Sequence, residues 1–318
     1  MKNLILSEPG LALQTRRGSL CIRERGGEET LHPARVHGLK TILLAGHGAS
    51  ITSEAMRWCT RETVALYLME RSGECLALLA DSHECDARRS ALTLRQRQFA
   101  AVLNPAKRLE IARKIVAGKL RTLALPTIEA REFRGEIAGA RSIEGLLVAE
   151  ARAGAAYFMR WRGFEMRFKP DNDTPQHWHS FAARAAGLLK GKGGTSKARH
   201  AATPMGALLN YAYIVGLGQV TRAAIGAGLD ACHGFLHSPK PGRLSLSYDV
   251  LEFHRAALTE GVFDFAGKRV FTRDDFELDA RGVVRLSGST AREIAALALK
   301  AAPVAETTKS VKRVTGWL

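Results

Sequence analysis

The sequence lacks the cysteine patterns that organise disulfide-rich and zinc-binding proteins. Its 318 residues include five cysteines, an odd number with no Cys-x-x-Cys pair, which argues against a disulfide framework or a zinc ribbon. It also lacks a long apolar run. The N-terminal MKNLILSEPG is too short a run for a signal peptide, and no stretch approaches the roughly 20 apolar residues of a membrane helix. We therefore expect a soluble cytoplasmic protein with reduced thiols.

Acidic residues are scarce relative to basic ones, with 31 Asp and Glu against 47 Lys and Arg and a formal net charge of +16. An excess of this size predicts a polyanionic partner such as nucleic acid. Charge alone leaves open a basic protein without catalysis. The chain also lacks the Gly-x-x-x-x-Gly-Lys-[Ser/Thr] register of a P-loop. The remaining composition, 46% hydrophobic and 25% charged, is that of a folded globular protein.

Short apolar runs separated by turn residues dominate the first quarter of the chain, which predicts β-strands. The runs lie at 4–6, 11–13, 20–22, 41–44 and 75–79. The breaks at which hairpins would turn are Pro9-Gly10, Arg17-Gly18 and Gly26-Gly27. One short helix is expected at 53–62, capped by Thr52 or Ser53. We predict a small β-rich N-terminal domain over residues 1–85.

The apolar spacing changes to three and four residues in the rest of the chain, which predicts an α-helical domain over residues 86–318. Residues 107–121 form a basic amphipathic helix that contains Lys119. Residues 206–230 are apolar enough for a helix hairpin in the core. The polar stretch 81–86 favours an interdomain linker. The predicted fold class is α+β, with a small N-terminal β-strand domain followed by a larger all-α domain.

Three further segments combine basic or ligand-type side chains. The segment 190–200, KGKGGTSKARH, contains glycines and four strong bases, namely Lys190, Lys192, Lys197 and Arg199. A mobile, phosphate-attracting loop and a plain solvated linker fit it equally well. His177-Trp178-His179 is half of a metal site at most, and without a third ligand nearby a surface loop is favoured. The basic segment 309–318 is either a disordered tail or a contact surface.

Four residues are candidates for chemistry. Glu150 lies in an apolar, small-residue segment, where a carboxylate is costly to bury unless it meets a cation or a metal. His237, Asp249 and Glu252 flank a Pro/Gly turn, with the two carboxylates three residues apart near a helix start. The candidate caps of that helix are Ser245 and Ser247. Carboxylates with one histidine suit Mg²⁺ or Mn²⁺. The alternative is an exposed Glu150 paired with a neighbouring arginine, an aspartate at a helix cap, an ion pair between Glu252 and Arg255, and a satisfied loop histidine.

Four motifs follow one another along the second half of the chain. They are AEARAGAAYF at 149–158, ALLNYAYIVGLGQVTRAAIGAGLD at 207–230, GFLH at 234–237 and SLSYDVLEFHR at 245–255. In this order they resemble the CRISPR-associated endonuclease and integrase family known as Cas one. Gly206 stands where the family usually has Asn and Ala151 where Gly is common, so the subtype stays open.

The resemblance implies that Glu150, His237 and Glu252 hold Mg²⁺ or Mn²⁺, with Asp249 supporting catalysis and Glu144 a bystander. The implied activity is that of a metal-dependent DNA endonuclease and integrase, which inserts spacers into a CRISPR array by transesterification at the repeat boundary. The implied partners are double-stranded DNA, a second copy bound through the N-terminal β-domain, and the small adaptation subunit Cas two in a heterohexamer. The candidate DNA contacts are Lys240, Arg243, Lys119, Lys190, Lys192, Lys197 and Arg199.

Two other functions fit parts of this pattern. A casposon-type transposon integrase shares the ligands, but that group usually carries an added C-terminal DNA-binding domain, and only residues 253–318 follow the last ligand here. The other is a non-catalytic nucleic-acid-binding scaffold that acts through its basic surface. Loss of metal-dependent cleavage in Glu150→Ala and His237→Ala variants would distinguish the enzyme from the scaffold.

Overall fold

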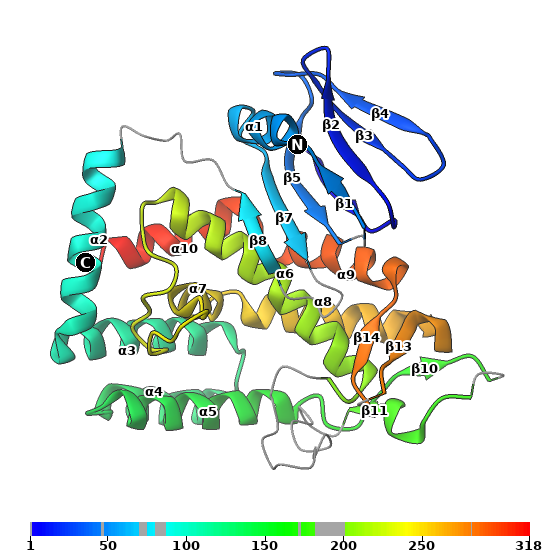
Figure 1. The fold of residues 1–318 in the computed structure, drawn as a ribbon. Coiled ribbons are helices and arrows are strands. Elements are labelled where there is room, and N and C mark those ends of the chain that lie inside the picture. Colours follow the sequence, from blue (N-terminus) through cyan, green and yellow to red (C-terminus); the bar gives the residue numbers. More distant parts are fainter. Residues whose placement is uncertain are drawn as a thin grey trace.

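The computed structural model describes residues 2–45, 48–69, 75–79, 87–170, 173–181, 201–280 and 282–318. Figure 1 shows the strand-rich part, residues 2–79, at the top of the molecule and the helical part, residues 87–318, below it. The predicted order of a small β-rich region followed by a larger helical one is therefore confirmed. Within the described ranges, no helix is both long and apolar enough to cross a membrane.

The strand-rich part contains two four-stranded sheets. The first has the order β1 (Lys2–Leu6), β5 (Leu39–Leu44), β7 (Ala65–Met69), β8 (Cys75–Leu79). Its first three strands are parallel and β8 is antiparallel to β7. The second has the order β4 (Glu29–His32), β3 (Ser19–Arg23), β2 (Ala12–Arg16), β6 (Ser50–Ile51). Helix α1 (Ser53–Arg61) begins after Thr52, whose side chain accepts a hydrogen bond from the Ala55 amide.

The predicted turns of the strand-rich part have different outcomes. Arg17-Gly18 joins β2 to β3 as a hairpin, with φ values of 49° and 79°, and Gly26-Gly27 turns between β3 and β4. The hairpin predicted at Pro9-Gly10 is wrong, because this turn carries the chain from β1 in one sheet to β2 in the other. Strands β4, β6 and β7 were not predicted. The exposed β4 lacks an apolar run, with the pattern ETLH, and the turn signals around β7 are weak.

The first sheet packs on both of its faces. Ile42 and Leu66 point into a core shared with the second sheet and α1. Leu43 and Tyr67, one residue farther along each strand, point into the core of the helical part. The Tyr67 hydroxyl donates a hydrogen bond of 3.0 Å to the Gly218 carbonyl on a helix of that part. Burial on both faces explains why these strands are continuous apolar runs rather than alternating ones.

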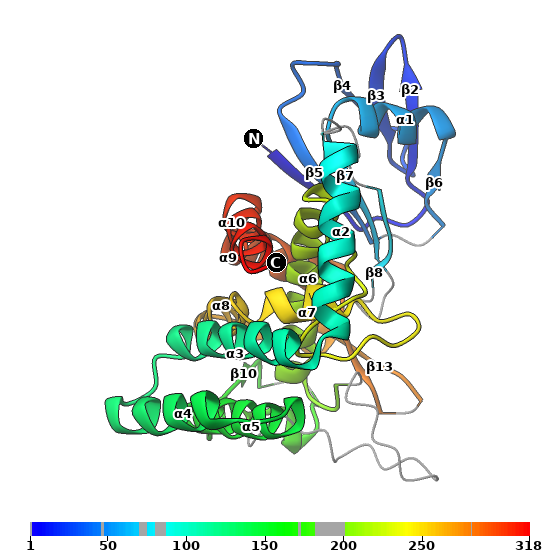
Figure 2. The ribbon, with the colours of Figure 1, turned by 90° about the vertical axis from the view of Figure 1, so that its left-hand side faces the viewer.

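Nine α-helices form the described helical part. They are α2 (Ala87–Leu103), α3 (Pro105–Thr122), α4 (Thr127–Gly139), α5 (Ile143–Met159), α6 (Pro204–Gly226), α7 (Ser245–Leu251), α8 (Arg255–Lys268), α9 (Gly288–Ala301) and α10 (Val304–Thr315). Helix α6 is central and contacts α7, α8, α9 and α10. In both Figure 1 and Figure 2, α4 and α5 form a layer below α3, and α2 runs from the level of the strands down to α3.

Helix α6 is one continuous helix, so the predicted hairpin at 206–230 is wrong. Its glycines serve close packing instead of a turn. A Cβ at Gly216 would lie 2.8 Å from Leu258 Cδ1, and one at Gly218 would lie 2.5 Å from Tyr67 Cε1. The segment 309–318, left open by the sequence, lies mainly in α10, and Trp317 packs against the main core.

The prediction of an all-α second part is not fully met, because this part also contains short strands. Short strand pairs join β9 (Phe164–Glu165) to β11 (Ser180–Phe181), β10 (Arg167–Phe168) to β12 (Val270–Phe271), and β13 (Phe276–Leu278) to β14 (Val284–Leu286). Two 3₁₀ turns accompany them, at Gln176–Trp178 and Arg273–Asp275. Trp178 is buried, and His179 Nε2 lies 2.8 Å from Thr174 Oγ1, so this histidine has a local partner. The predicted linker 81–86 lies outside the described residues.

Candidate active site

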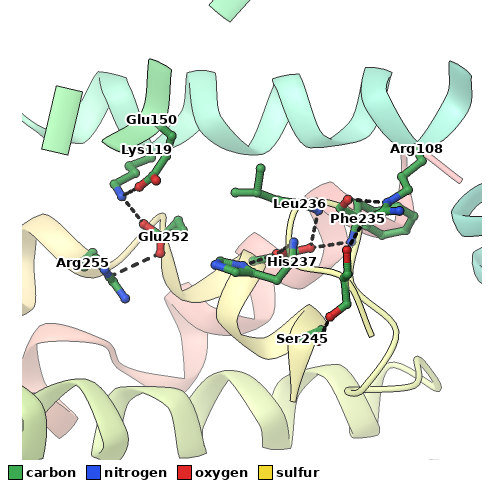
Figure 3. Close-up of polar contacts among 11 residues, drawn as sticks. Arg108, Lys119, Glu150, Phe235, Leu236, His237, Ser245, Glu252 and Arg255 are labelled. Carbon is green, nitrogen blue, oxygen red and sulfur yellow. Dashed lines mark hydrogen bonds and ion pairs between the residues drawn. The ribbon is translucent and has the colours of Figure 1, made fainter. Parts of the chain in front are cut away.

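Three helices and one loop bring the candidate residues together (Figure 3). Helix α3 begins at Pro105 after Asn104, which caps it by accepting from the Lys107 amide. Helix α5 begins after Ser142, which accepts from the Gly145 amide. These caps fix where each helix starts and therefore which residues face inward. Helix α7 and the loop before it complete the site, and Arg255 at the start of α8 adjoins it.

Lys119 of α3 lies between two of the predicted ligands. Its Nζ forms an ion pair with Glu150 Oε1 from α5 and lies 2.6 Å from Glu252 Oε2 at the end of α7. Only 5% of Lys119 is exposed. The sequence placed this lysine among the DNA contacts, because a basic helix pattern does not show which of its bases turn inward.

Glu252 is buried between two cations. It is 2% exposed, and its Oε1 lies 3.3 Å from Arg255 Nε while its Oε2 faces Lys119. Burial alone would raise the pKa of Glu252, but the charges of Arg255 and Lys119 outweigh it and hold that pKa below its usual value. Glu252 is therefore ionised across the physiological range.

Asp249 serves the polypeptide loop of residues 234–237. It is fully buried. Its Oδ2 accepts from the amides of Phe235 at 2.6 Å and Leu236 at 3.0 Å, and its Oδ1 accepts from the His237 amide at 2.9 Å. Oδ1 also lies 2.7 Å from His237 Nδ1. With both oxygens engaged, Asp249 acts as an organiser of this loop and an orienting partner of the imidazole.

The engaged Nδ1 decides what His237 offers to the site. When Nδ1–H donates to the Asp249 carboxylate, the free nitrogen is Nε2, which then carries the lone pair that a metal or a proton takes. His237 remains partly accessible, with 22% of its side chain exposed. The contact with Asp249 thereby holds the imidazole in one orientation.

The loop of residues 234–237 is held from two further sides. A Cβ at Gly234 would lie 2.7 Å from the Ser245 carbonyl carbon and 2.8 Å from Asp249 Oδ2, so this position requires glycine. Arg108 of α3 donates to the Phe235 carbonyl at 2.8 Å and to Ser238 Oγ at 3.0 Å. The loop is therefore fixed to α3 as well as to α7 (Figure 3).

The predicted caps of α7 are wrong. The residue at the cap position is Leu244, and no side chain caps the helix. Ser245 Oγ donates to the Ser238 carbonyl at 3.0 Å, and Ser247 Oγ accepts from Thr221. Ser245 thus closes the turn that precedes α7 rather than capping the helix.

The predicted DNA contacts near this turn are accessible. Lys240 is exposed and Arg243 is half-buried. The Arg243 guanidinium lies 5.6 Å from the ring centre of Tyr248, whose ring lies 6.1 Å from that of His237. A basic side chain is thus placed one aromatic ring away from the imidazole. Lys190, Lys192, Lys197 and Arg199 lie outside the described residues.

A cleft opens beside the Lys119 and Glu150 side chains. Its volume is about 390 Å³, and α3, α5 and α8 line it. Lys119, Glu150 and Arg255 lie along it together with apolar residues such as Leu123 and Phe158. The lining of the cleft is therefore charged near Lys119, Glu150 and Arg255 and apolar elsewhere.

The donor set fits a hard divalent ion. Glu150 and Glu252 supply carboxylate oxygens and His237 supplies Nε2, the ligand types that Mg²⁺ and Mn²⁺ accept. Within the part of the chain that the structure describes, no three His, Cys, Asp or Glu side chains are gathered as a metal-holding group. The cation between the two glutamates is Lys119. The chemistry of the residues fits an ion, and the carboxylates already hold a positive charge between them.

Sequence reasoning missed two residues that shape this site. Arg108 is one arginine among many, and only the fold brings it to the Phe235 carbonyl. The Glu252–Arg255 ion pair, which the sequence offered as the alternative to a metal site, is present at 3.3 Å. Gln98 of α2, fully buried, donates to the carbonyls of Asp230 and His233. A lone glutamine in a helix carries no sequence signal of such a role. Glu144, judged a bystander, is exposed in the first turn of α5.

Comparison with known proteins matches one family over nearly the whole chain. The model of the family described as CRISPR associated protein Cas1 matches residues 4–298. A protein from Thermus thermophilus named CRISPR-associated endonuclease Cas1 3 is 28% identical over 279 residues, which cover 85% of this chain and 75% of that protein.

Solved structures share the fold. A casposase bound to integration product has a TM-score of 0.77 at 20% identity, and the match covers 95% of this chain and 82% of that one. A chain of a Cas6-RT-Cas1–Cas2 complex has a TM-score of 0.71 at 16% identity, with 98% of this chain and 34% of that one covered. At these identities the likeness establishes the arrangement of a strand-rich part followed by a helical part.

Proposed function

Because the chain belongs to the CRISPR-associated Cas1 family, we propose that it is a divalent-metal-dependent DNA endonuclease and integrase. In this role it joins the 3′-hydroxyl of a short DNA duplex to a phosphodiester at the boundary of a CRISPR repeat. The relative from Thermus thermophilus is named an endonuclease, which supports the nuclease part of the proposal.

One observation supports this site as the location of the proposed activity. Two carboxylates from different helices, Glu150 and Glu252, converge on one cation, Lys119. The loop before α7 presents His237 nearby with its Nδ1 already engaged. An ion pair with a purely structural role does not require a histidine held in one orientation beside it. This arrangement is typical of a site that binds a metal and a phosphate.

Each residue has a role in this proposal. Glu150, Glu252 and His237 would hold Mg²⁺ or Mn²⁺, which supplies positive charge against the charge that develops on the phosphate. Asp249 positions His237 and holds the loop of residues 234–237. Arg243 and Lys240 at the neighbouring turn would contact the DNA backbone, which fixes its position without reading sequence.

The proposed partners follow from the family and from charge. The net charge of +16 favours double-stranded DNA. A second copy, bound through the strand-rich part, and the Cas2 subunit are proposed as protein partners. The complex whose chain shares this fold contains Cas2, which supports the second of these.

Cleavage and joining of a labelled branched DNA test the proposal, with Mn²⁺ or Mg²⁺ added. Glu150→Gln and His237→Ala are expected to lower both activities by about 100-fold or more, while DNA binding stays within about three-fold because the contacted phosphates are elsewhere. Glu144→Gln on the same helix is the matched control and should keep full activity. Wild-type protein without metal-dependent cleavage or joining would favour the non-catalytic DNA-binding scaffold.

A further inference from the structure

The Lys119 ammonium lies between the two carboxylates of the proposed metal site. Its Nζ contacts Glu150 and lies 2.6 Å from Glu252 Oε2, and the residue is 5% exposed. A buried lysine is costly unless it is paired, because its charge loses most of its water. This lysine is compensated by the same oxygens that would bind an ion (Figure 3).

The charges of the site balance without a metal. The carboxylates of Glu150 and Glu252 face the cations of Lys119 and Arg255. Arg255 approaches the other oxygen of Glu252, Oε1, at 3.3 Å. A divalent ion added to this group would leave an excess of positive charge close together, which is unfavourable in a poorly solvated place. Lys119 is the cation that competes for the oxygens facing the ion.

We propose that Lys119 is an internal stand-in for the metal. In the metal-free protein it holds Glu150 and Glu252 together, and it leaves their oxygens when a divalent ion binds. The proposal rests on the proposed function, because it assumes that these carboxylates bind a metal. Metal affinity is then set by competition between the ion and a lysine of the same chain.

The structure gives the displaced side chain a place to go. Lys119 itself lines the cleft of about 390 Å³, together with Ala155 and Phe158. Lysine has a flexible four-carbon stem and a compact charged group, so it moves between two positions more readily than arginine. In the cleft its ammonium remains beside the site, where a DNA phosphate oxygen is a natural partner.

The backbone of α3 stays in place during this exchange. Gly118 packs directly on the Phe253 ring, where a side chain would collide with it. Phe253 follows Glu252, so the distance between α3 and the carboxylate is set by this contact. The exchange therefore needs only rotation about the bonds of the lysine side chain.

Isothermal titration of Mn²⁺ into full-length protein tests the inference, with thermal unfolding of the same samples in chelator and in Mn²⁺. Lys119→Met is expected to bind Mn²⁺ about ten-fold more tightly or better, because two carboxylates lose their competing cation. Its metal-free melting temperature should fall, and the rise on adding Mn²⁺ should exceed that of the wild type. Lys119→Gln, which keeps a hydrogen-bond donor without the charge, replaces Lys119→Met if the latter does not fold.

Lys114→Met is the matched control. Lys114 lies on the same helix and pairs with Glu110 at 2.5 Å on a partly exposed surface, so its loss should leave Mn²⁺ affinity unchanged. Wild-type protein that binds Mn²⁺ while Lys119→Met and Lys119→Gln bind it equally or more weakly would overturn the stand-in role and leave the proposed function intact. Wild-type protein that binds no Mn²⁺ at all would overturn the proposed function itself.

Discussion

The two halves of the site are built by different forces. The Asp249 half is held by hydrogen bonds from three consecutive backbone amides and by the contact with His237 Nδ1. The Glu150 half is held by the ammonium of Lys119, which pairs with both Glu150 and Glu252. Backbone hydrogen bonds fix a geometry, whereas an ammonium is exchangeable for another cation. The first half is therefore complete without a metal, and the second half is arranged to change partners.

Replacement of Asp249, in the half held by backbone hydrogen bonds, should cause the largest loss of stability. Asp249→Ala leaves the amides of Phe235, Leu236 and His237 buried without an acceptor, and each such donor costs about 1–3 kcal/mol. We expect the free energy of unfolding to fall by at least about 3 kcal/mol, measured by denaturant titration in chelator.

Two variants bracket this result. Asp249→Asn, which keeps one carbonyl oxygen, should lose less than Asp249→Ala. Asp264→Ala removes an exposed carboxylate that pairs with Lys268 on α8 and should change stability by less than about 0.5 kcal/mol. A loss equally small in Asp249→Ala would show that the two halves do not differ in the way described.

Replacement of Glu150 should separate stability from activity. In Glu150→Gln, Lys119 still pairs with Glu252, so we expect the metal-free protein to lose less unfolding free energy than Asp249→Ala does. Denaturant titration in chelator, run beside the cleavage assay, measures both properties. A stability loss as large as that of Asp249→Ala would contradict the division into a fixed half and an exchangeable half.

The smallest expected effect is on the pH dependence of stability, and it concerns Asp275. This carboxylate lies outside the site but, like Asp249, accepts a hydrogen bond from a backbone amide. Asp275 accepts from the Thr272 amide at 2.7 Å and from Thr290 at 2.8 Å. Burial raises the pKa of Asp275, but the Thr272 amide, Thr290 and Arg269 together hold it below its usual value. A folded-state pKa below the unfolded value means that the stabilisation is complete above about pH 5 and is lost as the pH falls through the folded-state pKa.

The wild type should therefore be more stable than Asp275→Asn at neutral pH. This difference in unfolding free energy should shrink as the pH falls below about 4, the pKa of Asp in the unfolded state. Thermal unfolding across pH 3 to 7 measures this effect. Asp264→Asn, exposed on α8, is the control and should follow the wild type closely. If the difference instead widened toward acid pH, Asp275 would not be stabilised in its ionised form.

The sequence predicted a strand-rich part followed by a helical part because the spacing of apolar residues carries that information locally. It missed what depends on tertiary contact. The apolar density of residues 206–230 indicated a helix hairpin, although the segment forms one helix in which Gly218 makes room for Tyr67 from the strand-rich part. Ser245 matched a helix cap, although its hydroxyl closes a turn onto Ser238. In each case the local pattern was ambiguous, and a distant residue decided it.

The same limit applies to the candidate site. Ordered family motifs pointed to Glu150, His237, Asp249 and Glu252. Figure 3 shows Glu150, His237 and Glu252 in one region, and Asp249 contacts His237 at 2.7 Å. Spacing in the sequence did not separate the role of Asp249, which binds amides, from that of Glu252, which faces cations. Lys119 was one base in a basic helix. Its inward direction depends on the packing of α3 against its neighbours.

The contact between Tyr67 and Gly218 also has a consequence for unfolding, because it joins the strand-rich part to the helical part. The Tyr67 ring fills the place of a side chain on α6, and Arg222 donates to the carbonyls of Lys40 and Thr63. Separation of the strand-rich part from the helical part would expose a full face of the first sheet to water. We therefore expect the two parts to unfold as one cooperative unit, and a cut between them to yield fragments that each keep an uncovered apolar surface.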